Sequence, residues 1–168
     1  MACLVLTDDW LWVQRPRATR YNLQVRILVI NGPNLNLLGE REPDIYGRTT
    51  LSELEKIIQA EADDLGIEVS FMQSNSESGI LSALHEARGK FDGILINPGS
   101  FTHYSVAIAD ALKAVEIPAV EVHISNIFAR EGFRAKSVSG RACIGVITGF
   151  GPASYILGLH VLARVARK

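Results

Sequence analysis

A carboxylate and an imidazole stand two residues apart in this sequence, a spacing that suits an acid–base pair on one strand. Glu121 and His123 end a short apolar run, and the period of two along a strand places both side chains on one face. A carboxylate beside an imidazole fixes its tautomer and raises its basicity, which suits a general acid or base. The alternative is that His123 only caps the strand end and pairs with Glu121 without doing chemistry.

A second group of candidates lies in a long polar connection, residues 31–47. A strand-to-helix connection usually takes about 2–6 residues, whereas this one is several times longer and includes Arg41 and Tyr46. A tyrosine acts as a base near neutral pH if guanidinium groups lower its pKa from about 10 by about three units, which needs roughly 4 kcal/mol. Arg41 and Arg134 are the candidates for that role. The alternative is that Tyr46 is a turn aromatic that packs on the core.

The other motifs argue against metal and nucleotide chemistry. His103 stands just ahead of a predicted helix, and we interpret His85 and His160, on predicted helices, as structural or solvated. No two histidines have a metal-ligand spacing with a carboxylate in register. The run GFGPAS at residues 149–154 resembles a weakened dinucleotide fingerprint, but no strand with a terminal acid follows it. We therefore expect close packing of strand against helix there.

Alternating strands and helices must position these residues. Apolar runs predict strands at residues 25–30, 67–72, 93–96, 119–122 and 144–148. Amphipathic segments predict helices at residues 49–65, 77–88, 104–115 and 152–167. The pattern predicts the α/β class, with a five-stranded parallel sheet and helices on both faces. Right-handed crossovers then place the loops that follow the strands along one edge of the sheet.

Length and composition fit one globular domain. The 168 residues have a formal net charge of −1, which argues against a nucleic-acid binder. Residues 1–24 follow no clear period, and we interpret them as an extension outside a catalytic domain at residues 25–168; disorder and packing on a neighbouring subunit are both open. The isolated Cys3 and Cys143 favour reduced thiols in a cytoplasmic protein. No apolar run reaches the length that spans a membrane.

Four motifs, in this order, resemble type II 3-dehydroquinate dehydratase. They are NGPNLNLLGEREPDIYG at residues 31–47, QSNSE at 73–77, INPGSFTHYS at 96–105 and VEVHISNIFAREGFR at 120–134. The resemblance runs from about Val25 to the C-terminus. It implies a flavodoxin-like fold and a cofactor-free elimination of water from 3-dehydroquinate, through an enolate, to give 3-dehydroshikimate.

The resemblance also implies catalytic roles. Tyr46 would remove a proton from the carbon next to the ketone, and Arg41 would lower the pKa of Tyr46. Asn34 would steady the enolate oxygen through an ordered water. His123, held by Glu121, would protonate the leaving hydroxyl group.

The resemblance further implies how substrate and subunits are held. Family members assemble as trimers stacked into dodecamers, and Asp110 matches a position that reaches a neighbouring subunit's site. Substrate groups would be held by Asn97, His103, Ile124, Ser125 and Arg134. The alternative from another class is a flavodoxin-like module that binds a small anion or flavin without catalysis.

Overall fold

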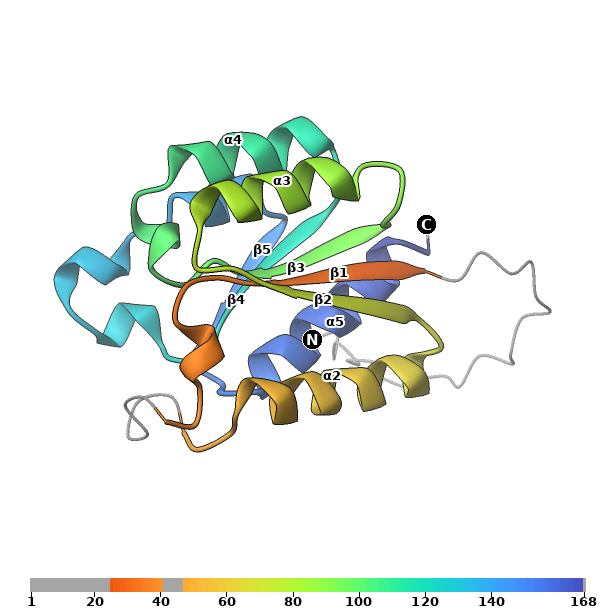
Figure 1. The fold of residues 1–168 in the computed structure, drawn as a ribbon, viewed down its shortest axis with the longest axis horizontal. Coiled ribbons are helices and arrows are strands. Elements are labelled where there is room, and N and C mark those ends of the chain that lie inside the picture. The colour runs from red at the N-terminus through yellow and green to blue at the C-terminus, as the bar shows by residue number, and fades with distance from the viewer. Residues whose placement is uncertain (1–24, 41–46, 168) are drawn as a thin grey trace, which may run out of the picture.

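The computed structural model describes residues 25–40 and 47–167, and in these residues five parallel strands form one sheet (Figure 1). The order across the sheet is β2-β1-β3-β4-β5. This is the strand order of flavodoxin-like sheets, so the predicted fold class is confirmed. The strands are β1 (Arg26–Asn31), β2 (Glu68–Gln73), β3 (Gly93–Asn97), β4 (Ala119–His123) and β5 (Gly145–Thr148).

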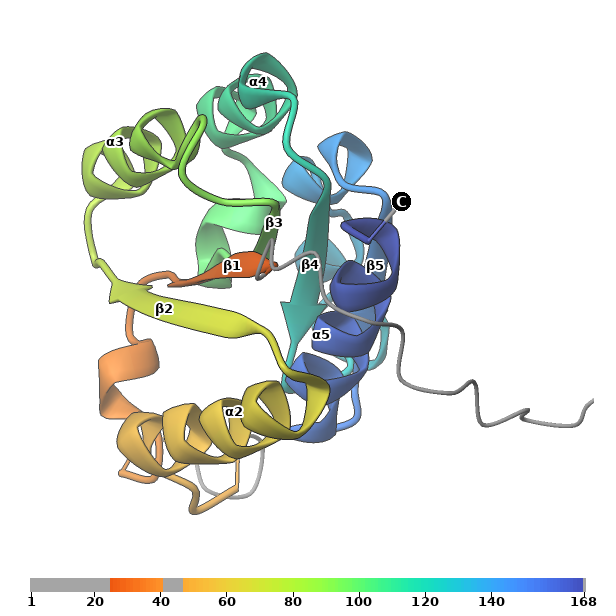
Figure 2. The same cartoon turned by 90° about the vertical axis from the view of Figure 1, so that its right-hand side faces the viewer.

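The described residues also form four α-helices, which cover the sheet in pairs (Figure 2). Helices α2 (Leu51–Leu65) and α5 (Ala153–Val165) lie on one face, and α3 (Glu77–Ala87) and α4 (Val106–Val115) lie on the other. The first of them begins with a capping box, in which Thr50 and Glu53 bond to each other's backbone N–H groups. None of the described helices is long and apolar enough to cross a lipid bilayer.

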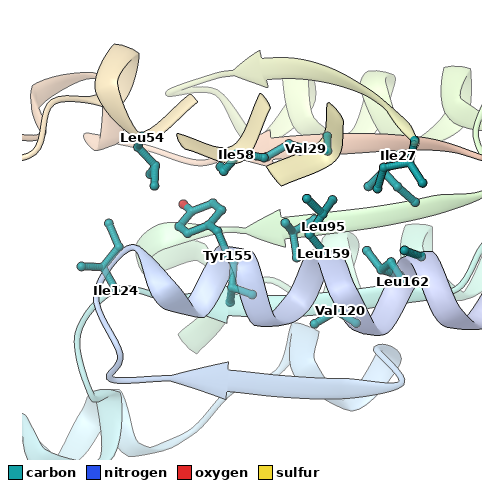
Figure 3. Close-up of a cluster of buried hydrophobic side chains, with 14 of the residues drawn as sticks. Ile27, Val29, Leu54, Ile58, Leu95, Val120, Ile124, Tyr155, Leu159 and Leu162 are labelled. Carbon is teal, nitrogen blue, oxygen red and sulfur yellow. The ribbon is translucent and has the colours of Figure 1, made fainter. Parts of the chain in front are cut away.

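Buried aliphatic side chains fill the layer between the sheet and the α2/α5 pair (Figure 3). Val29 and Leu95 come from the central strands, and Ile58 and Leu159 come from the two helices. The central strands are buried on both faces, which explains why their sequences are nearly continuous apolar runs. Tyr155 of α5 enters the same layer near the carboxyl-terminal ends of the strands.

Two connections differ from simple strand-to-helix turns. Helix α4 begins at Val106 rather than at residue 104, because the Ser105 hydroxyl caps it by accepting a hydrogen bond from the N–H of Ile108 at 2.9 Å. Residues 124–144, all of them described, join β4 to β5 without an α-helix and contain three short 3₁₀ helices, Ile127–Ala129, Gly132–Ala135 and Ser139–Ala142. This segment contributes Ser137 and Ser139, whose hydroxyls reach Glu121 of β4.

The strand order fixes where a ligand can enter. The chain leaves β1 for α2 on one face, and it leaves β3 for α4 on the other face. Because β1 and β3 are neighbours, the two departures open a crevice at their carboxyl-terminal ends. The candidate residues that follow β1, β3 and β4 are thereby brought to one edge.

Candidate active site

Strand β4 ends in a buried acid–base pair. Glu121 is fully buried and His123 is 5% exposed, and Nε2 of His123 lies 2.8 Å from Oε1 of Glu121. The predicted placement of both side chains on one face is confirmed. Because the carboxylate accepts this hydrogen bond, Nε2 carries a proton, and Nδ1 is the nitrogen left for other partners.

Three hydroxyl groups, which we term the hydroxyl cluster, complete the surroundings of Glu121. Thr102 and Ser137 each donate to Oε1 at 2.8 Å, and Ser139 donates to Oε2. Burial alone would raise the pKa of the Glu121 carboxyl, but the hydrogen bond and charge of His123, together with the hydroxyls of Ser139 and Thr102, hold this pKa below its usual value. Glu121 is therefore an anion at neutral pH, and its carboxylate accepts the hydrogen bond from Nε2 of His123.

A cavity of about 300 Å³ opens beside His123 at the carboxyl-terminal edge of the sheet. Its volume lies at the lower end of the range for ligand sites, which suits a small molecule. Leucines of the 35–38 segment form an apolar part of its wall. The polar part comes from the ends of β3 and β4 and from the connections after β1, β3 and β4, and consists of Asn34, Asn97, Ser100, His103, His123, Ser125, Arg130 and Arg134.

Two arginines bring positive charge to this wall. Nε of Arg134 donates to Oε2 of Glu131 at 2.9 Å, and Nε of Arg130 lies 3.5 Å from the same oxygen. The Arg134 guanidinium also lies 4.9 Å from the centroid of the Phe133 ring. Both guanidinium groups line the cavity, and groups of this kind suit an anionic ligand.

Polar contacts hold the turn after β1 at the cavity. Asn34 has a left-handed backbone, with φ of 65°, and its N–H donates to Oδ1 of Asn75 at 2.9 Å. Nε2 of Gln73 donates to the same Oδ1 at 3.0 Å and to the carbonyl of Gly32 at 3.2 Å. Left-handed backbone is uncommon outside glycine. The QSNSE motif thus stabilises the conformation that brings Asn34 to the wall.

The remaining histidines differ in their surroundings. Nδ1 of His103 lies 2.9 Å from the carbonyl of Lys136, so Nδ1 carries a proton and Nε2 is the nitrogen left for other partners. His160 pairs with Glu61 on the surface at 2.7 Å, which agrees with its interpretation as a structural or solvated residue. In residues 25–40 and 47–167, no group of three His, Cys, Asp or Glu side chains could hold a metal ion.

The sequence model of the family described as Dehydroquinase class II matches residues 25–163. This chain belongs to that family. Among the curated relatives is a 3-dehydroquinate dehydratase of Caldicellulosiruptor saccharolyticus, 56% identical over 141 residues, which cover 83% of this chain and 97% of the relative. Another is a 3-dehydroquinate dehydratase of Clostridium acetobutylicum, 54% identical over 144 residues, which cover 86% of this chain and 100% of the relative.

Solved dehydroquinase structures share the fold. The type II dehydroquinase of Butyrivibrio crossotus has a TM-score of 0.81 at 48% identity, over 83% of this chain and 97% of that chain. The type II dehydroquinase of Propionibacterium acnes has a TM-score of 0.79 at 41% identity, over 86% and 99% of the two chains. The family expected from the four motifs is therefore confirmed.

Most residues that the dehydroquinase resemblance assigns to the site lie around the cavity. Glu121 lies behind His123, whereas Asp110 on α4 is exposed and is not among the residues that line the cavity. Arg41 and Tyr46 lie outside the described residues. Gly47, the next residue in the chain, shares a second hollow with Ser125 and Arg130. The assigned residues that line the cavity are Asn34, Asn97, His103, His123, Ile124, Ser125 and Arg134.

Four residues of the site are not singled out by sequence spacing. Thr102, Ser137 and Ser139 form the hydroxyl cluster on Glu121, and Arg130 lines the cavity with Arg134. The available signals were weak, namely a Ser-x-Ser pair at residues 137–139 and a second arginine in the loop after β4. Serine and arginine are common in surface loops, so neither signal points to Glu121 or to the cavity.

Proposed function

We propose that this chain catalyses the elimination of water from 3-dehydroquinate to give 3-dehydroshikimate, without a cofactor and through an enolate. The observation that supports this most directly is the buried Glu121–His123 pair, which opens onto a cavity of suitable size, polarity and charge. Elimination from a β-hydroxyketone needs a base, an acid for a poor leaving group, and stabilisation of the enolate oxygen. The family of the chain is that of dehydroquinases.

His123 is the proposed acid. The base takes a proton from the carbon next to the ketone, and the electron pair of that C–H bond forms the enolate. When the enolate collapses, its electrons form the carbon–carbon double bond, and the C–O bond to the hydroxyl group breaks. A proton from Nδ1 of His123 joins this hydroxyl, which leaves as water. Glu121 supports this step because its carboxylate accepts from Nε2 of His123 and leaves Nδ1 as the nitrogen available at the cavity.

Tyr46 is the proposed base, and Arg41 is the proposed group that lowers its pKa. In the sequence, Arg41 directly follows Glu40 and Tyr46 directly precedes Gly47. Gly47 shares a hollow with Ser125 and Arg130 beside the cavity. This location supports a base that acts at the cavity. The reaction needs the phenolate form, which nearby guanidinium groups favour.

The remaining polar groups are proposed to hold the substrate. Asn34 steadies the enolate oxygen through an ordered water, and its place in the cavity wall supports this role. Arg134 suits the substrate carboxylate, since guanidinium groups bind carboxylates through paired hydrogen bonds. The substrate hydroxyls need donors and acceptors of the kind found at Asn97, His103, Ile124 and Ser125, with Ile124 acting through its backbone N–H.

We propose the assembly of trimers into a dodecamer, in which Asp110 reaches the site of a neighbouring subunit. Asp110 is exposed on α4, and the same helix presents Val106 with 61% of its surface exposed. An exposed apolar residue beside an exposed carboxylate fits a surface that another subunit covers. Light scattering tests the proposed assembly, because a monomeric, active protein would contradict both the assembly and the role of Asp110.

The cytoplasmic location stays a prediction.

A turnover assay with metal-free, nucleotide-free protein tests the proposed function. We expect conversion of 3-dehydroquinate to an enone, and the absorbance of the enone in the near ultraviolet measures this conversion. Absence of turnover at neutral pH by a folded protein would refute the proposal. A bound flavin in the purified protein would instead favour the binding module.

A further inference from the structure

A buried tyrosine of the last helix connects the ends of the two central strands. The hydroxyl of Tyr155 donates to Oδ1 of Asn31 at 2.7 Å and accepts a hydrogen bond from Nδ2 of Asn97 at 2.9 Å. Asn31 and Asn97 are the last residues of β1 and β3 and lie opposite each other in the sheet. One phenol thus bridges the strands at the point where the crevice opens.

The direction of these hydrogen bonds fixes which way the Asn97 amide faces. The N–H of Gly99 donates to Oδ1 of Asn97 at 3.1 Å, so this oxygen faces the turn after β3. Nδ2 then faces Tyr155 and uses one of its two hydrogens there. Among the described residues, no acceptor bonds to the second hydrogen of Nδ2, and Asn97 lines the cavity.

The bridge has little freedom to rearrange. Tyr155 and Asn31 are fully buried and Asn97 is 3% exposed, and the ring of Tyr155 lies among the aliphatic side chains of the core (Figure 3). Burial raises the pKa of the Tyr155 phenol, against the smaller opposing effect of its hydrogen bond with Asn97. Tyr155 is therefore a neutral group at working pH and is neither a base nor an acid in turnover.

We propose that Tyr155 is a positioning residue, which orients the Asn97 amide so that its second N–H hydrogen serves a substrate oxygen in the cavity. This inference rests on the proposed function. Asn31 contributes by accepting a hydrogen bond from the Tyr155 hydroxyl, and this bond keeps the lone pairs of the Tyr155 oxygen turned toward Asn97. Without this bridge only the N–H of Gly99 orients the amide, and an amide that rotates presents its oxygen to a substrate group that needs a donor.

The test is a double-mutant cycle with Tyr155→Phe and Asn97→Ala, measured by the turnover assay. We expect Tyr155→Phe to raise KM about tenfold, the equivalent of about 1.4 kcal/mol, with kcat changed less than twofold, because the interaction acts in ground state and transition state alike. In the Asn97→Ala background, Tyr155→Phe should add less than twofold. Tyr104→Phe is the matched control, since it removes a hydroxyl from a tyrosine that is 61% exposed, and its KM should equal that of the wild type.

An unchanged KM in Tyr155→Phe, or the same tenfold rise in both backgrounds, would overturn the inference. An inactive wild-type protein would refute the proposed function instead. If Tyr155→Phe does not fold, Asn31→Ala serves in its place, because it removes the oxygen that accepts from the Tyr155 hydroxyl and leaves the ring intact. The same rise in KM, again lost in the Asn97→Ala background, is expected there, and no rise would overturn the inference.

Discussion

Replacing Glu121 by glutamine tests the acid half of the proposed mechanism most directly. The substitution keeps the size of the side chain and removes its charge. In the wild-type protein, Oε1 of Glu121 accepts from His123, Thr102 and Ser137, and Oε2 accepts from Ser139. An amide retains one accepting oxygen, and serine and threonine hydroxyls can turn to accept from its NH2 group. The change in charge is therefore separated from a change in packing.

The expected loss follows from the geometry of the pair. Two unit charges 2.8 Å apart attract by about 6 kcal/mol at an effective dielectric constant of about 20. Desolvation offsets much of this, and hydrogen bonds to charged groups contribute about 1.5–3 kcal/mol net. If the acid loses this contribution from the Glu121 carboxylate, kcat should fall by about 10- to 150-fold.

The assay is kcat against pH, followed by enone absorbance in Glu121→Gln and wild type. Glu61→Gln is the matched control, because Glu61 also pairs with a histidine, His160, at 2.7 Å, but on the surface. The control should keep the wild-type kcat and pH profile. A folded Glu121→Gln protein with both properties unchanged would show that the carboxylate does not support the acid, and the assignment of His123 would lose its physical basis.

Three further results are expected. Tyr46→Phe should lower kcat by about 10²–10⁴-fold while substrate binding, measured by calorimetry, persists; a near-normal rate would exclude Tyr46 as the base. Arg41→Ala should raise the pH at which turnover begins by about 1–3 units, and an unchanged pH profile would contradict the proposed effect on Tyr46. The pKa of Glu121 is lowered on folding from 4.5, so its contribution to stability is present above pH 4.5 and is lost as the pH falls through the lowered value. Thermal melts should therefore depend less on pH below 4.5 in Glu121→Gln than in wild type.

The sequence was sufficient for the sheet and for the acid–base pair. Side chains two residues apart in a strand point to the same face, so the spacing of Glu121 and His123 was enough to place both on one face. The capping box at Thr50 and Glu53 could be predicted for the same reason, since it spans four consecutive residues. Predictions from local patterns of this kind do not depend on which residues pack against the segment.

The partners of these residues could not be predicted, because they lie far away in the chain. Ser139 reaches Glu121 from 18 residues away, and Tyr155 reaches Asn31 from 124 residues away. The glycine run also differs from the expected strand–helix packing. A Cβ at Gly149 would lie 2.9 Å from Cβ of Asn126, and the N–H of Gly149 donates to the carbonyl of His123 at 3.2 Å. The glycine allows the end of β5 to approach the loop that follows β4.

We expect the helix-free connection between β4 and β5 to determine how activity is lost on warming. Its Gly132–Ala135 segment buries no residue, although Ser137 and Ser139 in the same connection serve Glu121. Segments with few buried contacts open locally at free energies below that of global unfolding. Such an opening admits water to Glu121 while the sheet stays intact. Thermal inactivation should then precede the loss of helical circular dichroism, and amides of residues 130–136 should exchange hydrogen before those of β1 and β3.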